Sequence, residues 1–185
     1  LNISLSPSLW SNFTELQYVE TTSNAAGNPR YIMGALDQIV TRISARLTYM
    51  LTPNLSVQYY GQLFGTRGAY KNFKYITNSQ AVEYEDRFNV IVPALTDGTY
   101  SVDEDGNGST DYSFDKPDFK FGQYRSNMVI RWEYIPGSTL FLVWNQQADG
   151  VFDSQAGSIK SRVNFNFPQQ AHSIFLIKYT YRFIL

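Results

Sequence analysis

The chain has 185 residues with 15 basic and 16 acidic side chains, so its net charge is −1, and it contains no cysteine. With this balance and no run of basic residues, nucleic-acid binding has no electrostatic footprint, and the lack of cysteine excludes disulfides and thiolate metal sites. Charged residues make up only 17% of the chain, whereas soluble domains carry about 25%. A transmembrane helix needs an apolar run of about 18 residues, and no run in the sequence is that long. No transmembrane helix is therefore predicted.

Seven strands are predicted from the alternation of apolar and polar residues and from the turn residues between them. They cover about residues 1–6, 12–21, 38–51, 55–64, 118–134, 139–147 and 172–185. Short connections with proline lie at 6–8, 52–54 and 135–138, and long connections lie at about 22–37, 65–117 and 148–171. Short turns that alternate with long loops are typical of outer-membrane β-barrels.

The connection lengths also assign a direction to each predicted strand. If the short turns are periplasmic, the last strand runs down to the periplasm, where the C-terminus of a barrel belongs. The first predicted strand then also runs downward, and an odd strand number differs from the even numbers of bacterial barrels. We therefore expect further strands before Leu1. Residues 1–185 are predicted to be the C-terminal portion of an antiparallel transmembrane β-barrel, incomplete in this chain, with a long extracellular acidic loop at about 65–117.

One face of each long predicted strand carries no charge. In 38–51 the odd positions are neutral, and in 122–134 the even positions are neutral. Because a Lys or Arg at the bilayer midplane of a barrel costs about 2–4 kcal/mol, this segregation predicts a face toward lipid. The opposite face would line the lumen, where its charges either bind a plug or select anionic solutes, or are simply hydrated or paired across strands. The predicted lumen residues are Arg42, Arg46, Arg125, Arg131, Glu133, Lys178 and Arg182.

Aromatic residues gather near the predicted periplasmic strand ends, where a membrane girdle would anchor in the headgroup layer. The predicted girdle consists of Tyr49, Trp132, Tyr134, Tyr181 and Phe183. The alternative is an aromatic stripe in a soluble sandwich. The predicted strand 38–51 favours the barrel, because it is far longer than the about 5–6 residues of a typical globular strand.

Three stretches carry a likeness to a known family: LTPNLSVQYYGQLFGTRGAYKNFKY (51–75), VDEDGNGSTDYSFDKPDFKFGQYRSNMVIRWEYIPGSTLFLVWNQ (102–146) and IFLIKYTYRF (174–183). They resemble the C-terminal region of the Gram-negative family catalogued as domain of unknown function 5916. The block at 131–144 is the most specific part. The resemblance implies a longer protein, in which a sandwich similar to family-9 carbohydrate-binding modules precedes an outer-membrane barrel. It assigns no catalytic residues. The chain departs from the usual aromatic end of barrel insertion signals, because Ile184 and Leu185 follow Phe183.

An acidic stretch of the predicted long loop has the spacing of a calcium-binding loop. Its predicted ligands, at positions 1, 3, 5 and 9 of DEDGNGSTD, are Asp103, Asp105, Asn107 and Asp111. Gly108 takes the tight-turn position, but Phe114 stands where the usual bidentate Glu would be. The alternative is a Gly-rich acidic surface loop that needs no metal.

Signatures of catalysis are weak, so no enzyme is expected. The only histidine, His172, is best explained as a polar residue of the lumen face. Glu83 and Glu85 would be the acid pair of an envelope hydrolase, but a solvated acidic surface explains them better.

The sequence predicts a non-enzymatic β-barrel segment in the cell outer membrane. Its partners would be membrane lipid and other envelope proteins or glycans. It would serve as the anchor or conduit of an upstream glycan-binding domain or envelope complex. The alternative function is a secreted all-β carbohydrate-binding module whose aromatic residues stack on sugars.

Overall fold

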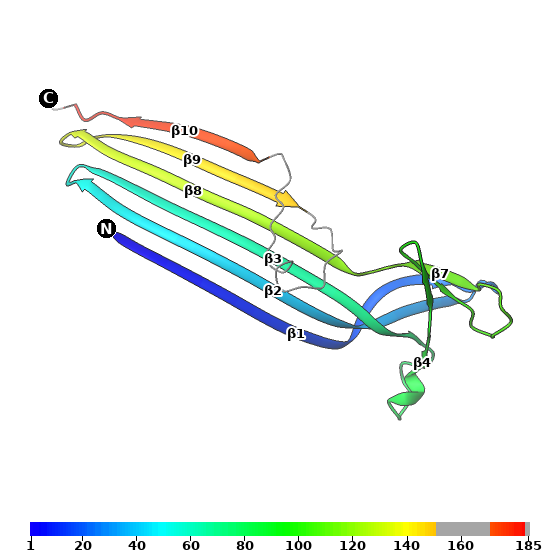
Figure 1. The fold of residues 1–185 in the computed structure, drawn as a ribbon. Helices are drawn as coiled ribbons and strands as arrows, with labels where there is room; N and C mark the ends of the chain where they lie inside the picture. Colours follow the sequence, from blue (N-terminus) through cyan, green and yellow to red (C-terminus); the bar gives the residue numbers. More distant parts are fainter. Residues whose placement is uncertain (151–170, 184–185) are drawn as a thin grey trace. The chain divides into compact units, whose positions relative to one another are not determined.

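The protein is all-β in the computed structural model, which describes residues 1–150 and 171–183 (Figure 1). Six long strands lie side by side in the order β1–β2–β3–β8–β9–β10, and a short strand, β4, pairs with β3. The long strands are β1 (Asn2–Ser23), β2 (Pro29–Thr52), β3 (Leu55–Ile76), β8 (Phe119–Ile135), β9 (Ser138–Gly150) and β10 (His172–Thr180). In the described part of the chain, β1 and β10 are the edges of an open sheet, so no closed barrel is present.

The shorter elements lie between β3 and β8. They are the 3-10 helix η1 (Glu85–Arg87), β4 (Phe88–Val90), and a separate antiparallel sheet of β5 (Ala94–Thr96), β6 (Thr99–Val102) and β7 (Tyr112–Asp115). The segment predicted as a long loop at about 65–117 therefore contains the end of β3 and four further strands. The sequence prediction missed them because each is only three or four residues long, too short for a clear alternating pattern.

The chain divides into two compact units. Unit 1 comprises Leu1–Trp10, Val40–Thr66 and Lys120–Leu185, and unit 2 comprises Ser11–Ile39 and Arg67–Phe119.

The prediction of two strands at 1–6 and 12–21, joined by a turn, is wrong. The structure has one continuous strand, β1, which runs through Ser6, Pro7 and Ser8. Proline lacks only a backbone N–H, and it is tolerated in edge strands such as β1, where one side of the backbone has no neighbouring strand. With one strand in place of two, the described residues contain an even number of long strands, so the odd count that led us to expect a strand before Leu1 is not observed.

The predicted short turns at 52–54 and 135–138 are confirmed. β2 ends at Thr52 and β3 begins at Leu55, so two residues separate them. Two residues likewise separate the end of β8 at Ile135 from the start of β9 at Ser138. Gly137 has a φ of +82°, a conformation that L side chains rarely adopt. The backbone N–H of Glu133 donates to the carbonyl of Asn54 at 2.8 Å, so the two turns lie at the same end of unit 1.

At the ends away from the short turns, β2 and β3 are longer than predicted. β2 begins at Pro29 rather than near 38, and β3 continues to Ile76 rather than stopping near 64. β10 ends at Thr180, and most of the predicted connection 148–171, together with residues 184–185, lies outside the described residues.

Unit 2 has an apolar core of its own. The ring of Phe73 lies 4.9 Å from that of Tyr100 and 5.1 Å from that of Phe114, measured between centroids. In β7, Tyr112 and Phe114 are buried while Ser113 and Asp115 are exposed, as the period-2 geometry of a strand requires. The buried core residues are Ile32, Phe73, Tyr75, Ile91, Val102, Tyr112 and Phe114.

Candidate functional site

The strand register of unit 1 places the predicted lipid-facing residues of three strands on one side of the sheet. Residues opposite one another in an antiparallel pair point to the same side. Three successive cross-strand rows on this side are Met128–Trp144–Phe175, Ile130–Leu142–Ile177 and Trp132–Leu140–Tyr179. We call this side the neutral face, and we call the opposite side, with alternating residues such as Val129 and Arg131, the polar face.

Side-chain contacts agree with this assignment. The rings of Trp144 and Phe175 are stacked with centroids 5.5 Å apart, as expected for opposed residues of one face. The hydroxyls of Tyr59 and Tyr124 lie 3.1 Å apart, so the odd residues of β3 share the neutral face with the even residues of β8. The alternation seen in the sequence is therefore continuous across neighbouring strands of unit 1.

The neutral face is almost free of charge. Among the described residues of unit 1, its only charged side chain is Lys120, at the margin of the unit. Between Tyr124 and Tyr134 on β8 the uncharged positions cover ~33 Å along the strand at ~3.3 Å per residue. At the usual tilt of barrel strands this corresponds to ~25 Å across a membrane, the height of the apolar band in outer-membrane barrels.

Aromatic residues of the neutral face meet at the end of unit 1 that carries the short turns. The ring of Tyr134 stacks on that of Tyr179 at 5.7 Å and lies 6.0 Å from that of Trp132. The rings of Tyr181 and Phe183 are 4.8 Å apart, and Tyr49 lies near the end of β2. Tyr134 is half-buried, whereas the other five are exposed, from 44% for Tyr49 to 81% for Phe183. Tyr179 was not among the predicted girdle residues, and the register of β9 and β10 is what adds it.

The predicted lumen residues of the strands lie together on the polar face of unit 1. Arg42 lies over the ring of Trp10 at 5.9 Å, and Arg46 lies over that of Tyr60 at 5.0 Å. These contacts put residues of β1, β2 and β3 on one side of the sheet.

The strands β8 to β10 contribute the remaining charges of this face. Arg131, Phe141 and Lys178 form one cross-strand row, in which Lys178 lies 5.8 Å from the Phe141 ring. Arg131 pairs with Glu133 at 2.9 Å, and Arg125 lies opposite Gln147.

Two further residues predicted from the sequence to face the lumen are Arg182 and His172. Arg182 follows the end of β10, where its backbone N–H donates to Ser138 Oγ at 3.0 Å and its side chain lies against Gly137. It therefore lies at the turn rather than within a strand. His172 lies opposite Gln147, and no group of metal-ligating side chains surrounds it in the described part of the chain.

In unit 2 the acidic loop between β6 and β7 gathers three of its four predicted calcium ligands. Carboxylate oxygens of Asp103, Asp105 and Asp111 lie within 4.8 Å of one another. The fourth residue, Asn107, uses its side-chain oxygen to accept the Ser109 N–H at 2.8 Å. The amide nitrogen of Asn107 donates to Asp105 Oδ2 at 2.8 Å. The loop thus brings together the charges that a hard cation would need, while the ligating oxygen of Asn107 is engaged by Ser109.

Backbone N–H groups hold the first residue of this loop. Asp103 accepts hydrogen bonds from the backbone of Gly108, Gly106 and Asn107, and these bonds lower the pKa of its carboxyl. Gly106 and Gly108 adopt φ of +74° and +87°, which lets the chain fold back around the carboxylate. The negative charge is therefore stabilised by the loop itself.

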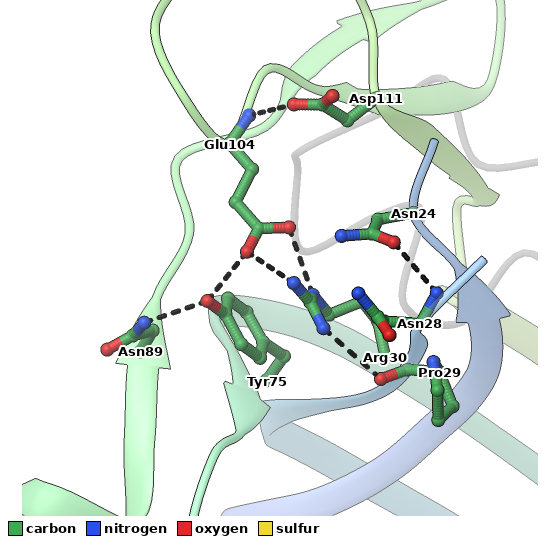
Figure 2. Close-up of polar contacts among 8 residues, drawn as sticks. All are labelled: Asn24, Asn28, Pro29, Arg30, Tyr75, Asn89, Glu104 and Asp111. Carbon is green, nitrogen blue, oxygen red and sulfur yellow. Dashed lines mark hydrogen bonds and ion pairs between the residues drawn. The ribbon is translucent and has the colours of Figure 1, made fainter. Parts of the chain in front are cut away.

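Between Asp103 and Asp105, Glu104 anchors the loop to the strands of unit 2 (Figure 2). Its carboxylate accepts from Arg30 Nε at 2.9 Å and Nη2 at 2.7 Å, and from the Tyr75 hydroxyl at 2.8 Å. Its backbone N–H donates to Asp111 Oδ2 at 2.7 Å, and Asn89 donates to the Tyr75 hydroxyl at 2.8 Å. The bonds from Arg30 and Tyr75 lower the pKa of the Glu104 carboxyl, and the same contact with Glu104 raises the pKa of Arg30.

This network was not predicted, because Arg30 and Glu104 are 74 residues apart in the sequence. The only local signal for this network is the position of Glu104 between Asp103 and Asp105. Its side chain points away from the carboxylate cluster, toward Arg30 and Tyr75. Tyr112, next to this network, is buried, and burial raises the pKa of its hydroxyl to about 12.

We expect the Glu104 network to make the stability of unit 2 depend on pH. Because the folded pKa of Glu104 lies below its ordinary value of 4.5, its stabilisation is complete above that value and is lost as pH falls through the folded pKa. Glu104→Gln should reduce stability at pH 7 by about 1–3 kcal/mol and flatten the dependence between pH 5 and 3. Hydrogen exchange of the β6 and β7 amides measures this, and a variant that keeps the full wild-type pH dependence would contradict it.

The calcium site stays a prediction with a direct test. Calcium titration of the complete protein by calorimetry should give a Kd of about 10⁻⁴–10⁻³ M, the range of extracellular calcium modules. The double variant Asp103→Asn/Asp105→Asn should bind no calcium, while Asp97→Asn, which removes an exposed carboxylate in the β5–β6 turn, should bind as the wild type does. Absence of binding heat in the wild type, or unchanged binding in the double variant, would refute the site.

Glu83 and Glu85 are both exposed, the second within η1. Among the described residues, no helix is long and apolar enough to cross a membrane. Comparisons with family models, with curated proteins and with solved structures found no match.

Proposed function

We propose that unit 1 is part of the wall of a transmembrane β-barrel in the outer membrane of a Gram-negative cell. The observation that carries this proposal is the neutral face. Strand register aligns its rows over β8, β9 and β10, and nearly all charges of the described part of unit 1 lie on the other face. Lipid imposes this segregation, because each Lys or Arg on the lipid side would cost about 2–4 kcal/mol.

The exposed aromatic residues support the same proposal. The exposed rings of Trp132 and Tyr179 each contact the half-buried ring of Tyr134 beside the short turns, where the headgroup layer would begin. A soluble protein rarely leaves so many apolar side chains open to water without a partner. On the neutral face of β10 these are Phe175 at 72%, Ile177 at 72% and Tyr179 at 61% exposure.

We propose further that the protein is a non-enzymatic anchor or conduit. The resemblance to the family of domain of unknown function 5916 supports an upstream glycan-binding domain or an envelope complex as its partner. Glu83 and Glu85, the acid pair that a hydrolase would need, are exposed and neither is engaged in an ion pair among the described residues.

The competing function is a secreted carbohydrate-binding module. Its support is the group of rings at Trp132, Tyr134 and Tyr179, of which the first and the last are exposed, since exposed aromatic rings can stack on sugars. A module of this kind would be soluble without detergent and would bind glycans as a monomer. The two proposals therefore differ in the solvent that the neutral face contacts.

Fractionation of cells that express the complete protein distinguishes them. A barrel is recovered in the outer-membrane fraction, requires detergent for extraction, and migrates differently on gels before and after heating. Recovery of the complete protein as a soluble periplasmic or secreted species would overturn the barrel proposal. Retention of that soluble species on a glycan column would favour the carbohydrate-binding module.

A further inference from the structure

The polar face of unit 1 carries an excess of positive charge, although the whole chain has a net charge of −1. Two carboxylates lie on this face in the described strands, Glu133 and Asp149. The basic residues of the same strands outnumber them: Arg42, Arg46, Arg125, Arg131 and Lys178.

Ion pairs account for little of this charge. Arg131 pairs with Glu133, which lies on the same strand, at 2.9 Å. Arg42, Arg46 and Lys178 lie over aromatic rings, and no described carboxylate is within ion-pair distance of them. Among the described residues, only Arg125 has a carboxylate near it across strands, that of Asp149 on β9, so cross-strand pairing accounts for few of these charges.

The second carboxylate is held by amides. Asp149 accepts from Gln123 Nε2 at 2.7 Å and from Gln147 Nε2 at 3.0 Å. A guanidinium that lies over a ring keeps N–H donors at its edge, where they can bind an anion. The polar face thus combines fixed cations with few competing carboxylates.

We propose that the polar face of unit 1 binds small anions and makes the barrel an anion-selective conduit. This inference rests on the proposed function, because it requires the polar face to line a lumen. Rings of Arg and Lys select anions in pores by raising their local concentration and repelling cations. The class of solute is small inorganic or carboxylate anions.

The test is the reversal potential of the complete protein in planar bilayers across a potassium chloride gradient. We expect an anion-to-cation permeability ratio above about three, and at least a roughly twofold decrease of this ratio in Arg42→Gln/Arg46→Gln. Lys120→Gln is the control, because it also removes a positive charge but from the neutral face. This variant should leave the permeability ratio unchanged. Heat-modifiable migration of each variant shows that it is folded.

Each other outcome overturns the inference. Folded, inserted protein that gives no conductance, or that conducts with no preference or a cation preference, would refute anion selection and leave the anchor function intact. A double variant with wild-type selectivity would show that Arg42 and Arg46 do not select. Protein that does not insert into membranes at all would overturn the proposed function together with the inference.

Discussion

Ile130→Arg is expected to destabilise the membrane-inserted protein by about 2–4 kcal/mol, because the guanidinium would lie near the middle of the neutral face. Ile130 belongs to the row Ile130–Leu142–Ile177, which has further uncharged rows on both sides. Equilibrium unfolding from lipid vesicles measures the change in free energy. A lower yield in the outer membrane would accompany it.

Val129→Arg is the matched control. Val129 is the preceding residue of the same strand, lies opposite Val143 and faces the polar side together with Arg131. An arginine there stays hydrated in a lumen, so we expect a change within about 1 kcal/mol. Equal costs for the two substitutions would contradict the assignment of the two faces.

Phe73→Ala is expected to produce the largest loss of stability in unit 2, about 3–5 kcal/mol. Phe73 is only 4% exposed and its ring contacts those of Tyr100 and Phe114. The cavity would remove packing between β3 and the separate sheet of β5 to β7. Amide hydrogen exchange in β6 and β7 should accelerate by about a hundredfold or more.

Val92→Ala is the control for this second substitution. Val92 follows β4 and is 93% exposed, so the loss of its methyl groups should change stability by less than about 0.5 kcal/mol. Unchanged exchange in Phe73→Ala would mean that β6 and β7 do not depend on the core of unit 2.

The sequence predicted the parts of the fold that depend on local periodicity. The alternation at 128–132 identified one neutral and one polar face, and the register shows that the neighbouring strands share these faces. The turns at 52–54 and 135–138 were predicted because proline and glycine favour turns there. The same rule failed at Pro7, since the sequence does not indicate that β1 is an edge strand, where proline can be accommodated.

Features that depend on distant contacts were missed. The short strands β6 and β7 are stabilised by the buried core around Phe73, which no local pattern reveals. The Arg30–Glu104 pair joins residues that are far apart in the sequence, and only the fold brings them together. The structure groups Asp103, Asp105 and Asp111, three of the four residues that the acidic spacing selected, and their binding of calcium stays a prediction. The spacing did not reveal that Glu104 fastens the loop to β2 and β3.

Contact of the neutral face with lipid is tested most directly by single spin labels along β8. The chain has no cysteine, so cysteine can be introduced at each of the residues 128–132 in turn. We predict that labels at 128, 130 and 132 are relaxed preferentially by oxygen, which concentrates in lipid, and that labels at 129 and 131 are relaxed by a water-soluble nickel complex. Access of the nickel complex to all five positions, or the absence of alternation, would contradict the account.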